Sequence, residues 1–185
     1  SLPEGLDELE NLEVLDLSGC KSLGSFGEVL EKLTKLTELN ISGCKVLPAL
    51  PECLEQLSAL KELDVSGCTF TEVTSTKLPK GPLRTLKVKG CASMKTLDVR
   101  GCASLETLGS VKGCKSLNVL ILSGCKSLPE LPGDLKTLSQ LDTLDASDCA
   151  KLMKLPSDVL AYLKELRVLD VSGCESLTIL DLRNC

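Results

Sequence analysis

Cysteine and aspartate are the residue types in this chain whose spacing could support chemistry. Of the eleven cysteines among 185 residues, ten end the same short apolar pattern, at Cys20, Cys44, Cys68, Cys91, Cys102, Cys114, Cys125, Cys149, Cys174 and Cys185. Zinc sites use closely spaced cysteine and histidine ligands, but the sequence has no C-x-x-C pair and no histidine. We therefore expect no zinc site and interpret the thiols as structural.

Catalysis finds little support in the same residues. A nucleophilic thiol needs a nearby cation that lowers its pKa. Cys91, two residues after Lys89, is the only mild candidate, and we interpret it as structural as well. Histidine, the commonest general base, is absent, and so are the glycine-rich phosphate-binding motifs and the G-x-S-x-G motif. The sequence predicts no enzyme activity and no cofactor.

The shared pattern, L-x-x-L-x-[LIVA]-x-x-C, is typical of a strand followed by a turn. Side chains alternate along a strand, so its apolar residues face one side, as at Leu36, Leu39 and Ile41 before Cys44. A buried free cysteine behaves as a small apolar side chain with a weak S–H donor. Because stacked equivalent thiols have no natural pairing, we expect reduced thiols and a cytoplasmic or other reducing compartment.

The intervening residues then face solvent and are acidic in most copies. The candidate partner-binding residues on this face are Asp16, Asn40, Asp64, Lys87, Lys89, Asp98, Arg100, Ile121, Asp145, Asp170 and Asp181. One interpretation is ordinary turn chemistry, with a solvated aspartate before each turn. Another is a docking stripe for a basic protein, interrupted by cations that set its register. A calcium site on the acidic row is a third and less favoured one.

Two apolar residues stand among these outward positions. Val119 and Ile121 could form a hot spot for a partner. They could equally lie under a neighbouring loop or on the opposite face of the molecule.

Spacing divides the repeats into long and short units. Successive cysteines of the pattern are 24, 24, 23, 11, 12, 11, 24, 25 and 11 residues apart. Long units contain a proline followed by leucines at every third position, which predicts a short helical or 3-10 segment. The best candidate for a true helix is 156–166, with Ser157 as its N-cap.

The short units are too brief to circle a core. Eleven residues at about 3.3 Å each make half a turn, so we expect a second strand on the opposite side over residues 91–125. Three short spacings total 34 residues, or one and a half turns. Either one turn is enlarged or the pattern switches faces. The extra residue between Leu108 and Cys114 predicts a bulge, and residues 69–82 have the composition of a loop.

Several stretches resemble a known repeat family. LEVLDLSGCKSL (12–23), LKELDVSGC (60–68) and LRVLDVSGCESL (166–177) resemble cysteine-containing leucine-rich repeats. LPECLEQLSAL (50–60) resembles repeats of plant nucleotide-binding immune receptors, and the short S-G-C units are similar to kinetoplastid leucine-rich-repeat proteins. The resemblance implies a β-rich α/β fold: a right-handed solenoid with a curved parallel β-sheet and short helical, 3-10 or extended convex segments. It also implies binding of a protein on the concave sheet.

Length and charge narrow the range of possible functions further. We expect one domain over 1–185, as a segment of a longer protein that lacks both polar capping repeats. The net charge of −5 disfavours nucleic acid, and no apolar run is long enough for a membrane span. The favoured function is a non-enzymatic interaction or scaffold module. A structural assembly component and a regulatory sensor region of a larger signalling or immune-type protein stay open, and no oligomeric state is predicted.

Overall fold

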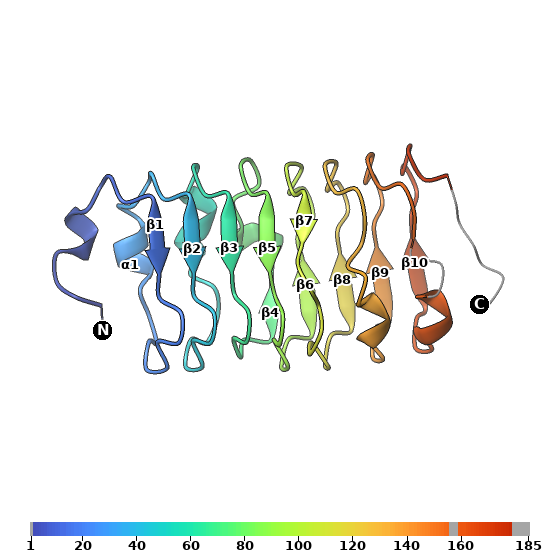
Figure 1. Ribbon diagram of the computed structural model, residues 1–185, viewed down its shortest axis with the longest axis horizontal. Coiled ribbons are helices and arrows are strands. Elements are labelled where there is room, and N and C mark those ends of the chain that lie inside the picture. The colour runs from blue at the N-terminus through green and yellow to red at the C-terminus, as the bar shows by residue number, and fades with distance from the viewer. Residues whose placement is uncertain (1, 156–158, 179–185) are drawn as a thin grey trace.

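The chain winds into coils that stack in a nearly straight row (Figure 1). The computed structural model describes residues 2–155 and 159–178. Two parallel five-stranded sheets run along the stack. The first sheet holds, in spatial order, β1 (Val14–Asp16), β2 (Glu38–Asn40), β3 (Glu62–Asp64), β5 (Thr85–Lys87) and β7 (Thr107–Leu108). The second sheet holds β4 (Glu72–Val73), β6 (Thr96–Asp98), β8 (Val119–Ile121), β9 (Thr143–Asp145) and β10 (Val168–Asp170).

Register in both sheets follows the repeat. In the first sheet Leu15 pairs with Leu39, 24 residues later, and Leu39 pairs with Leu63 after another 24. The middle residue of each of these strands is buried and its neighbours are more exposed. A one-residue slip would turn the leucines outward, so burial of the leucines fixes the register.

The core is one continuous column of aliphatic side chains and thiols. In the second coil Leu36, Leu39, Ile41 and Cys44 are at most 2% exposed. Burial of each leucine contributes about 1.5–3 kcal/mol, which is why leucine at these positions can replace aromatic residues. The inward direction predicted for the pattern is confirmed.

Short helices lie mostly on the sides that lack strands, although η3 directly follows β4. They are η1 (Leu6–Glu8), α1 (Gly27–Leu30), η2 (Glu52–Gln56), η3 (Ser75–Lys77), η4 (Leu135–Thr137) and η5 (Leu160–Tyr162). The 3-10 segments expected after prolines are confirmed at η2, which follows Pro51, and at η4, whose Leu135 donates its N–H to Pro132.

The helix predicted over 156–166 is wrong in the part that the structure describes, where only η5 forms, and Ser157 lies outside that part. Leucines at every third position suit the three residues per turn of a 3-10 segment.

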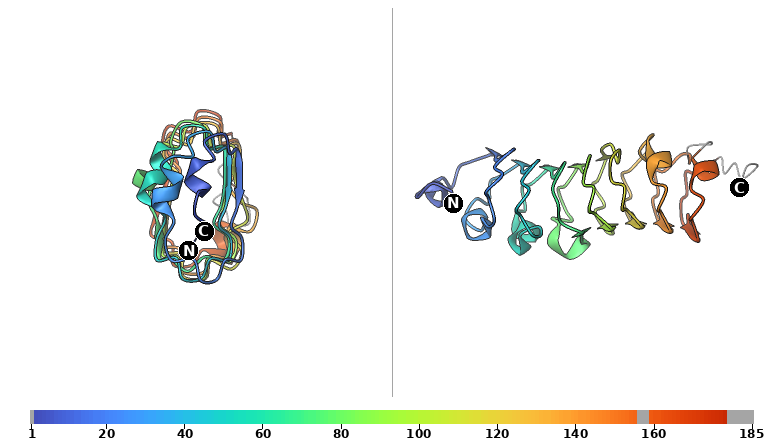
Figure 2. Two further views of the ribbon diagram at one scale, coloured as in Figure 1. Left: turned by 90° about the vertical axis from the view of Figure 1, so that its left-hand side faces the viewer. Right: turned by 90° about the horizontal axis from the view of Figure 1, so that it is seen from below.

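The repeat changes sides in the middle of the molecule. Strands β5, β6, β7 and β8 alternate between the two sheets, and β9 and β10 then remain in the second. Figure 2 shows the consequence: α1, η2 and η3 lie on one side of the stack, and η4 and η5 lie on the other. The half-turn interpretation is confirmed and a single enlarged turn is wrong, because three half-turns leave the pattern on the opposite side.

Residues 69–82 are a degenerate copy of the repeat, and the prediction of a loop is wrong. Phe70, Val73, Ser75 and Leu78 are all buried, and β4 pairs with β6 in full register. Ser75 takes the third apolar position and Leu78 takes the place of the cysteine, 24 residues before Cys102. The threonines that suggested a loop occupy its outward positions.

Candidate functional site

The third residue of most strands closes a turn with its own side chain. Oδ1 of Asp16 accepts the N–H of Ser18 at 2.7 Å. The same bond forms at Asn40, Asp64, Asp98, Asp145 and Asp170. This Asx-turn geometry confirms the interpretation of these residues as turn chemistry. Hydrogen bonds from Ser18 lower the pKa of Asp16, and those from Ser172 lower the pKa of Asp170, so both carboxylates stay ionised.

The candidate residues divide between the two sheets. The outward side of the first sheet, here called the first face, carries Asp16, Asn40, Asp64 and Lys87, with Lys89 just after β5. The outward side of the second sheet, the second face, carries Asp98, Ile121, Asp145 and Asp170, with Arg100 just after β6. Asp181 lies outside the described residues. The prediction of one concave face for the whole set is wrong, because the three half-turns carry the later strands to the other side.

The first face is strongly acidic. Glu38 and Glu62 stand directly opposite each other in the ladder, and Lys87 Nζ lies 3.8 Å from Glu62. In the neighbouring row Asn40 donates to Asp16 at 3.3 Å. These residues surround a shallow hollow of about 140 Å³ over β1, β2 and β3. Like charges about 4 Å apart repel by about 1 kcal/mol even in water, so a cation that docks here relieves repulsion.

Sequence reasoning left the two glutamates out of the candidate set. Glu38 and Glu62 both precede the middle leucine of their strands, in the phrases TELN and KELD. That shared position was the available signal. The structure makes them candidate binding residues because the two glutamates pair directly across neighbouring strands.

The second face is more apolar. Its first outward row is Glu72, Thr96, Val119, Thr143 and Val168. Val168 is 48% exposed, and Ile121 is aligned between Asp98 and Asp145. Arg100 Nε is 2.9 Å from Asp98 and neutralises it, whereas Asp145 and Asp170 face each other directly. This face therefore combines an apolar strip with one acidic pair.

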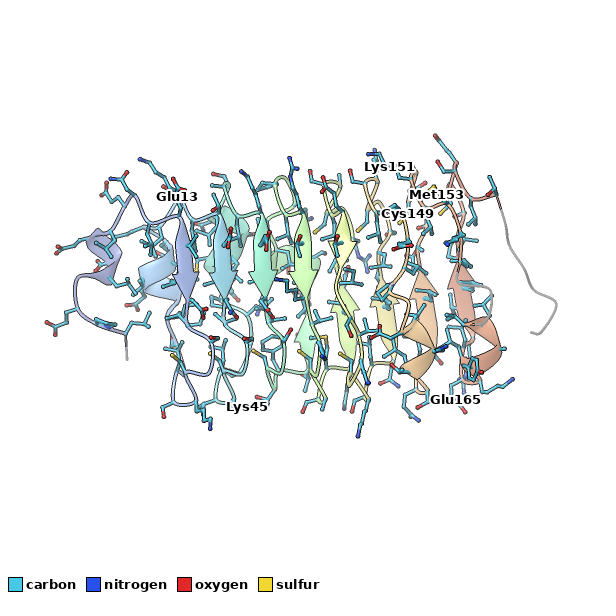
Figure 3. The ribbon with its side chains drawn as sticks, viewed as in Figure 1. Glu13, Lys45, Cys149, Lys151, Met153 and Glu165 are labelled. Carbon is cyan, nitrogen blue, oxygen red and sulfur yellow. The ribbon has the colours of Figure 1, made fainter. Side chains whose placement is uncertain are left out.

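The turns after the two sets of strands lie at opposite edges of the solenoid (Figure 3). Lys45, in the turn after β2, lies at the lower edge of that view, and Lys151, after β9, lies at the upper edge. The strands of the two sheets thus run in opposite directions across the molecule. The two faces cannot merge into a single surface.

The thiols form two buried columns. Most of the buried S–H groups donate to a carbonyl of the preceding coil, as from Cys91 to Val65 at 3.1 Å and from Cys125 to Val99 at 3.4 Å. Desolvation raises the pKa of Cys91 to about 12. Burial thus suppresses the thiolate, which is the nucleophilic form. Among the described thiols, Cys20 is the exposed one.

Within 2–155 and 159–178, no three cysteine, aspartate or glutamate side chains gather as metal ligands would. Over the same residues, no helix has the length and apolar character that a transmembrane crossing demands.

A family model described as Zer-1-like leucine-rich repeats matches residues 4–87. The stacked coils with their in-register leucines have the leucine-rich-repeat fold. The match covers only the N-terminal coils with full-length spacing and ends at Lys87, the last residue of β5, where the half-turn units begin. Among the curated proteins no significant match is found.

Solved structures with similar coils come from several kinds of protein. The leucine-rich-repeat domain of the type III effector XopL is 24% identical, with a TM-score of 0.41 over 92% of this chain and 72% of that one. Internalin C2 of Listeria monocytogenes is 20% identical, with a TM-score of 0.45 over 91% and 74%. The plant peptide hormone receptor RGFR1, in complex with RGF2, is 17% identical, with a TM-score of 0.36 over 99% and 42%. The leucine-rich-repeat assignment rests on the family model and the coil geometry.

Proposed function

We propose that this leucine-rich-repeat solenoid is a non-enzymatic recognition module that binds protein partners on its two sheet faces. The observation that carries the proposal is the in-register acidic pair Glu38–Glu62, on an open sheet beside the carboxylates of Asp16 and Asp64. A stacked sheet holds these groups in fixed positions, so binding costs little ordering of the main chain.

The first face fits a basic protein surface. Its hollow is lined by Asp16, Glu38, Glu62 and Asp64, with Lys87 as the one cation. Mixed charges of this kind set the orientation and selectivity of a partner more than its raw affinity.

The second face fits a different surface. Val119 and Ile121 lie in β8 and Val168 lies in β10, on either side of β9 and near the acidic pair Asp145–Asp170. Apolar side chains at the centre of a contact, with charges at its rim, are the usual arrangement of a protein interface. A partner with an apolar centre and basic rim would match it.

Affinity capture with matched variants tests the first face. Partners captured by the wild-type chain from the source cells are identified by mass spectrometry, and their affinity is measured with purified components. Glu38→Lys/Glu62→Lys should weaken a first-face partner at least tenfold, which is about 1.4 kcal/mol. The control Glu52→Lys/Glu55→Lys changes the net charge equally in η2, on the opposite side of the same coils.

Three outcomes oppose the proposal. If both double variants weaken binding equally, the effect is one of overall charge. If neither changes any partner's affinity, the first face is not a docking surface. If the purified chain instead self-associates in sedimentation runs, and charge reversal on either face has no effect on partner binding, a structural assembly role replaces the recognition role.

A reducing compartment is part of the same proposal. The thiols are engaged with main-chain carbonyls inside the core, as Cys114 is with Val88 at 3.1 Å. Titration of the denatured chain, purified without reductant, should count all eleven thiols. A count lower by two or more would place the protein in an oxidising compartment.

A further inference from the structure

The first sheet ends in a slot on the far side of β7. Beyond Thr107–Leu108 the next coil supplies residues 129–134, which do not pair with β7. The two segments enclose a groove of about 520 Å³. Its walls are 106–110 and 129–134.

Both ends of the slot are tied. At one end the N–H of Ser127 donates to the carbonyl of Ala103 at 3.1 Å. At the other end the carboxylate of Asp134 accepts the N–H groups of Val111 and Lys112 at 3.1 and 3.2 Å. Between these ties the coils separate, so the opening is a defined feature of the fold.

The sequence explains the separation. The spacing from Cys102 to Cys114 carries one residue more than its neighbours. The ladder between β5 and β7 ends after Leu108, whereas that between β3 and β5 continues for one more residue, which confirms the predicted irregularity after Leu108. On the other wall Pro129 and Pro132 lack the N–H that a strand ladder needs. Glu130 pairs with Lys154 of the following coil and not with β7.

One wall is a free strand edge. The N–H groups of Thr107 and Gly109 donate to Arg84 and Leu86 of the preceding coil. Alternation along a strand therefore turns the N–H and C=O of Leu108 toward the slot. Since β7 is the last strand of the first sheet, these groups are available to another strand.

The lining is apolar below and acidic at the rim. Leu108 and Leu131 are only 5% and 3% exposed and form the floor. Glu106 and Glu130 stand on opposite walls, and Arg84 lies 3.4 Å from Glu106. At the corresponding edge of the second sheet, next to β4, η2 packs against η3.

We propose that this slot binds an extended, basic segment of a partner protein, which adds to β7 as an extra strand. Its alternate side chains rest on Leu108 and Leu131, and its lysine or arginine side chains face Glu106 and Glu130. Strand addition of this kind gains main-chain hydrogen bonds at the free edge and selectivity from alternate side chains. The site is separate from the acidic pair Glu38–Glu62, so it does not depend on the proposed function of that face.

The test uses the whole chain and the synthetic peptide acetyl-Lys-Val-Lys-Thr-Lys-Val-Lys-amide, with a glutamate-for-lysine peptide as control. Gly133→Trp fills the slot at a position where nothing lies within 4 Å of an added Cβ. Gly81→Trp is the matched control, because its added Cβ also has open space and it lies outside the slot. Circular dichroism confirms that each variant folds, and amide hydrogen exchange of Leu108 reports strand addition.

The basic peptide should bind wild type and Gly81→Trp equally, and should bind Gly133→Trp at least tenfold more weakly. It should slow exchange of the Leu108 amide, and Glu38→Lys/Glu62→Lys should bind it as wild type does. No measurable binding, equal binding by Gly133→Trp, equal binding of the glutamate peptide, or unchanged Leu108 exchange would each overturn the proposal. Loss of binding in Glu38→Lys/Glu62→Lys alone would move the peptide to the first face.

Discussion

The two halves of this solenoid carry the same repeat on opposite sides. Before β5 every cysteine-bearing copy of the pattern places its strand in the first sheet, and after β8 every described copy places it in the second. Core positions are equally buried in both halves, as at Leu63 and Leu144. The repeat therefore decides which side chains are inside, and the number of half-turns decides which side of the molecule becomes a sheet.

Outward positions differ between the halves because the core does not constrain them. The first face has the glutamate pair Glu38–Glu62 where the second has Val119 and Val168 in the same row. A solenoid can thus keep one packing solution and change its surface chemistry from coil to coil.

Deletion of one half-turn unit should have the largest effect. Without residues 92–102 the junction again reads Cys-Ala-Ser, and only two half-turns remain, so β9 should move to the first-sheet side. Deletion of 92–114 removes a whole coil and should leave β9 where it is. Spin labels introduced as unnatural amino acids at Asn40 and Asp145 report the change through their separation. If the shorter deletion keeps the two labels on opposite sides, the number of half-turns does not decide the side on which β9 lies.

Leucine truncation probes whether the two halves are equally packed. Leu63→Ala and Leu144→Ala should each lower the free energy of unfolding by about 2–5 kcal/mol, because both side chains are at most 1% exposed. Urea titration measures both. A cost below about 1 kcal/mol at either site would show that one half is packed more loosely.

Alkaline pH should weaken both thiol columns together. Burial raises the pKa of Cys91, in the first column, and of Cys149, in the second, to about 12. An unfolded thiol titrates near about 8.5, so the protonated thiols stabilise the fold fully below that pH and the contribution is lost as pH rises toward 12. Urea midpoints should fall from pH 9 upward. The fall should be smaller in Cys91→Ala and Cys149→Ala, and unchanged in Cys20→Ala; a midpoint independent of pH up to 11 would contradict this.

The smallest expected effect concerns one turn of the second column. Asp148 has a φ of 54°, whereas glycine holds this left-handed position in the neighbouring coils, as at Gly124 with a φ of 74°. Asp148→Gly should stabilise the fold by about 0.5–1 kcal/mol, since relief of left-handed strain exceeds the entropy cost of glycine. A lower urea midpoint would mean that the Asp148 side chain, close to Gly173, makes a favourable contact.

Much of the fold could be predicted from the sequence because leucine and cysteine recur in phase. The strands, the inward thiols, the 3-10 segments after prolines and the second sheet over 91–125 all follow from spacing. The choice of face could not be made, since an eleven-residue unit such as 92–102 fits either side equally well. The copy at 70–78 was missed because Ser75 and Leu78 replace the residues that mark the pattern.

The candidate site was predictable only residue by residue. The aspartates were correctly placed outward, and their role in turns follows from the serine two residues later, as Ser66 follows Asp64. Their division between two faces depended on whether the pattern changes sides over residues 91–125, which the spacing left open. The slot beside β7 depends on where two coils separate, and the extra residue before Cys114 gave only a hint of it.

The overlap of the two sheets also bears on how the chain folds. Coils between β3 and β8 carry strands on both sides, whereas the coils toward either end, within residues 2–155 and 159–178, carry a strand on one side only. Each of these central coils gains two ladders of main-chain hydrogen bonds from a neighbour about 24 residues away. In a nearest-neighbour array the most strongly coupled units form the nucleus, so assembly should begin at the centre and propagate toward both termini.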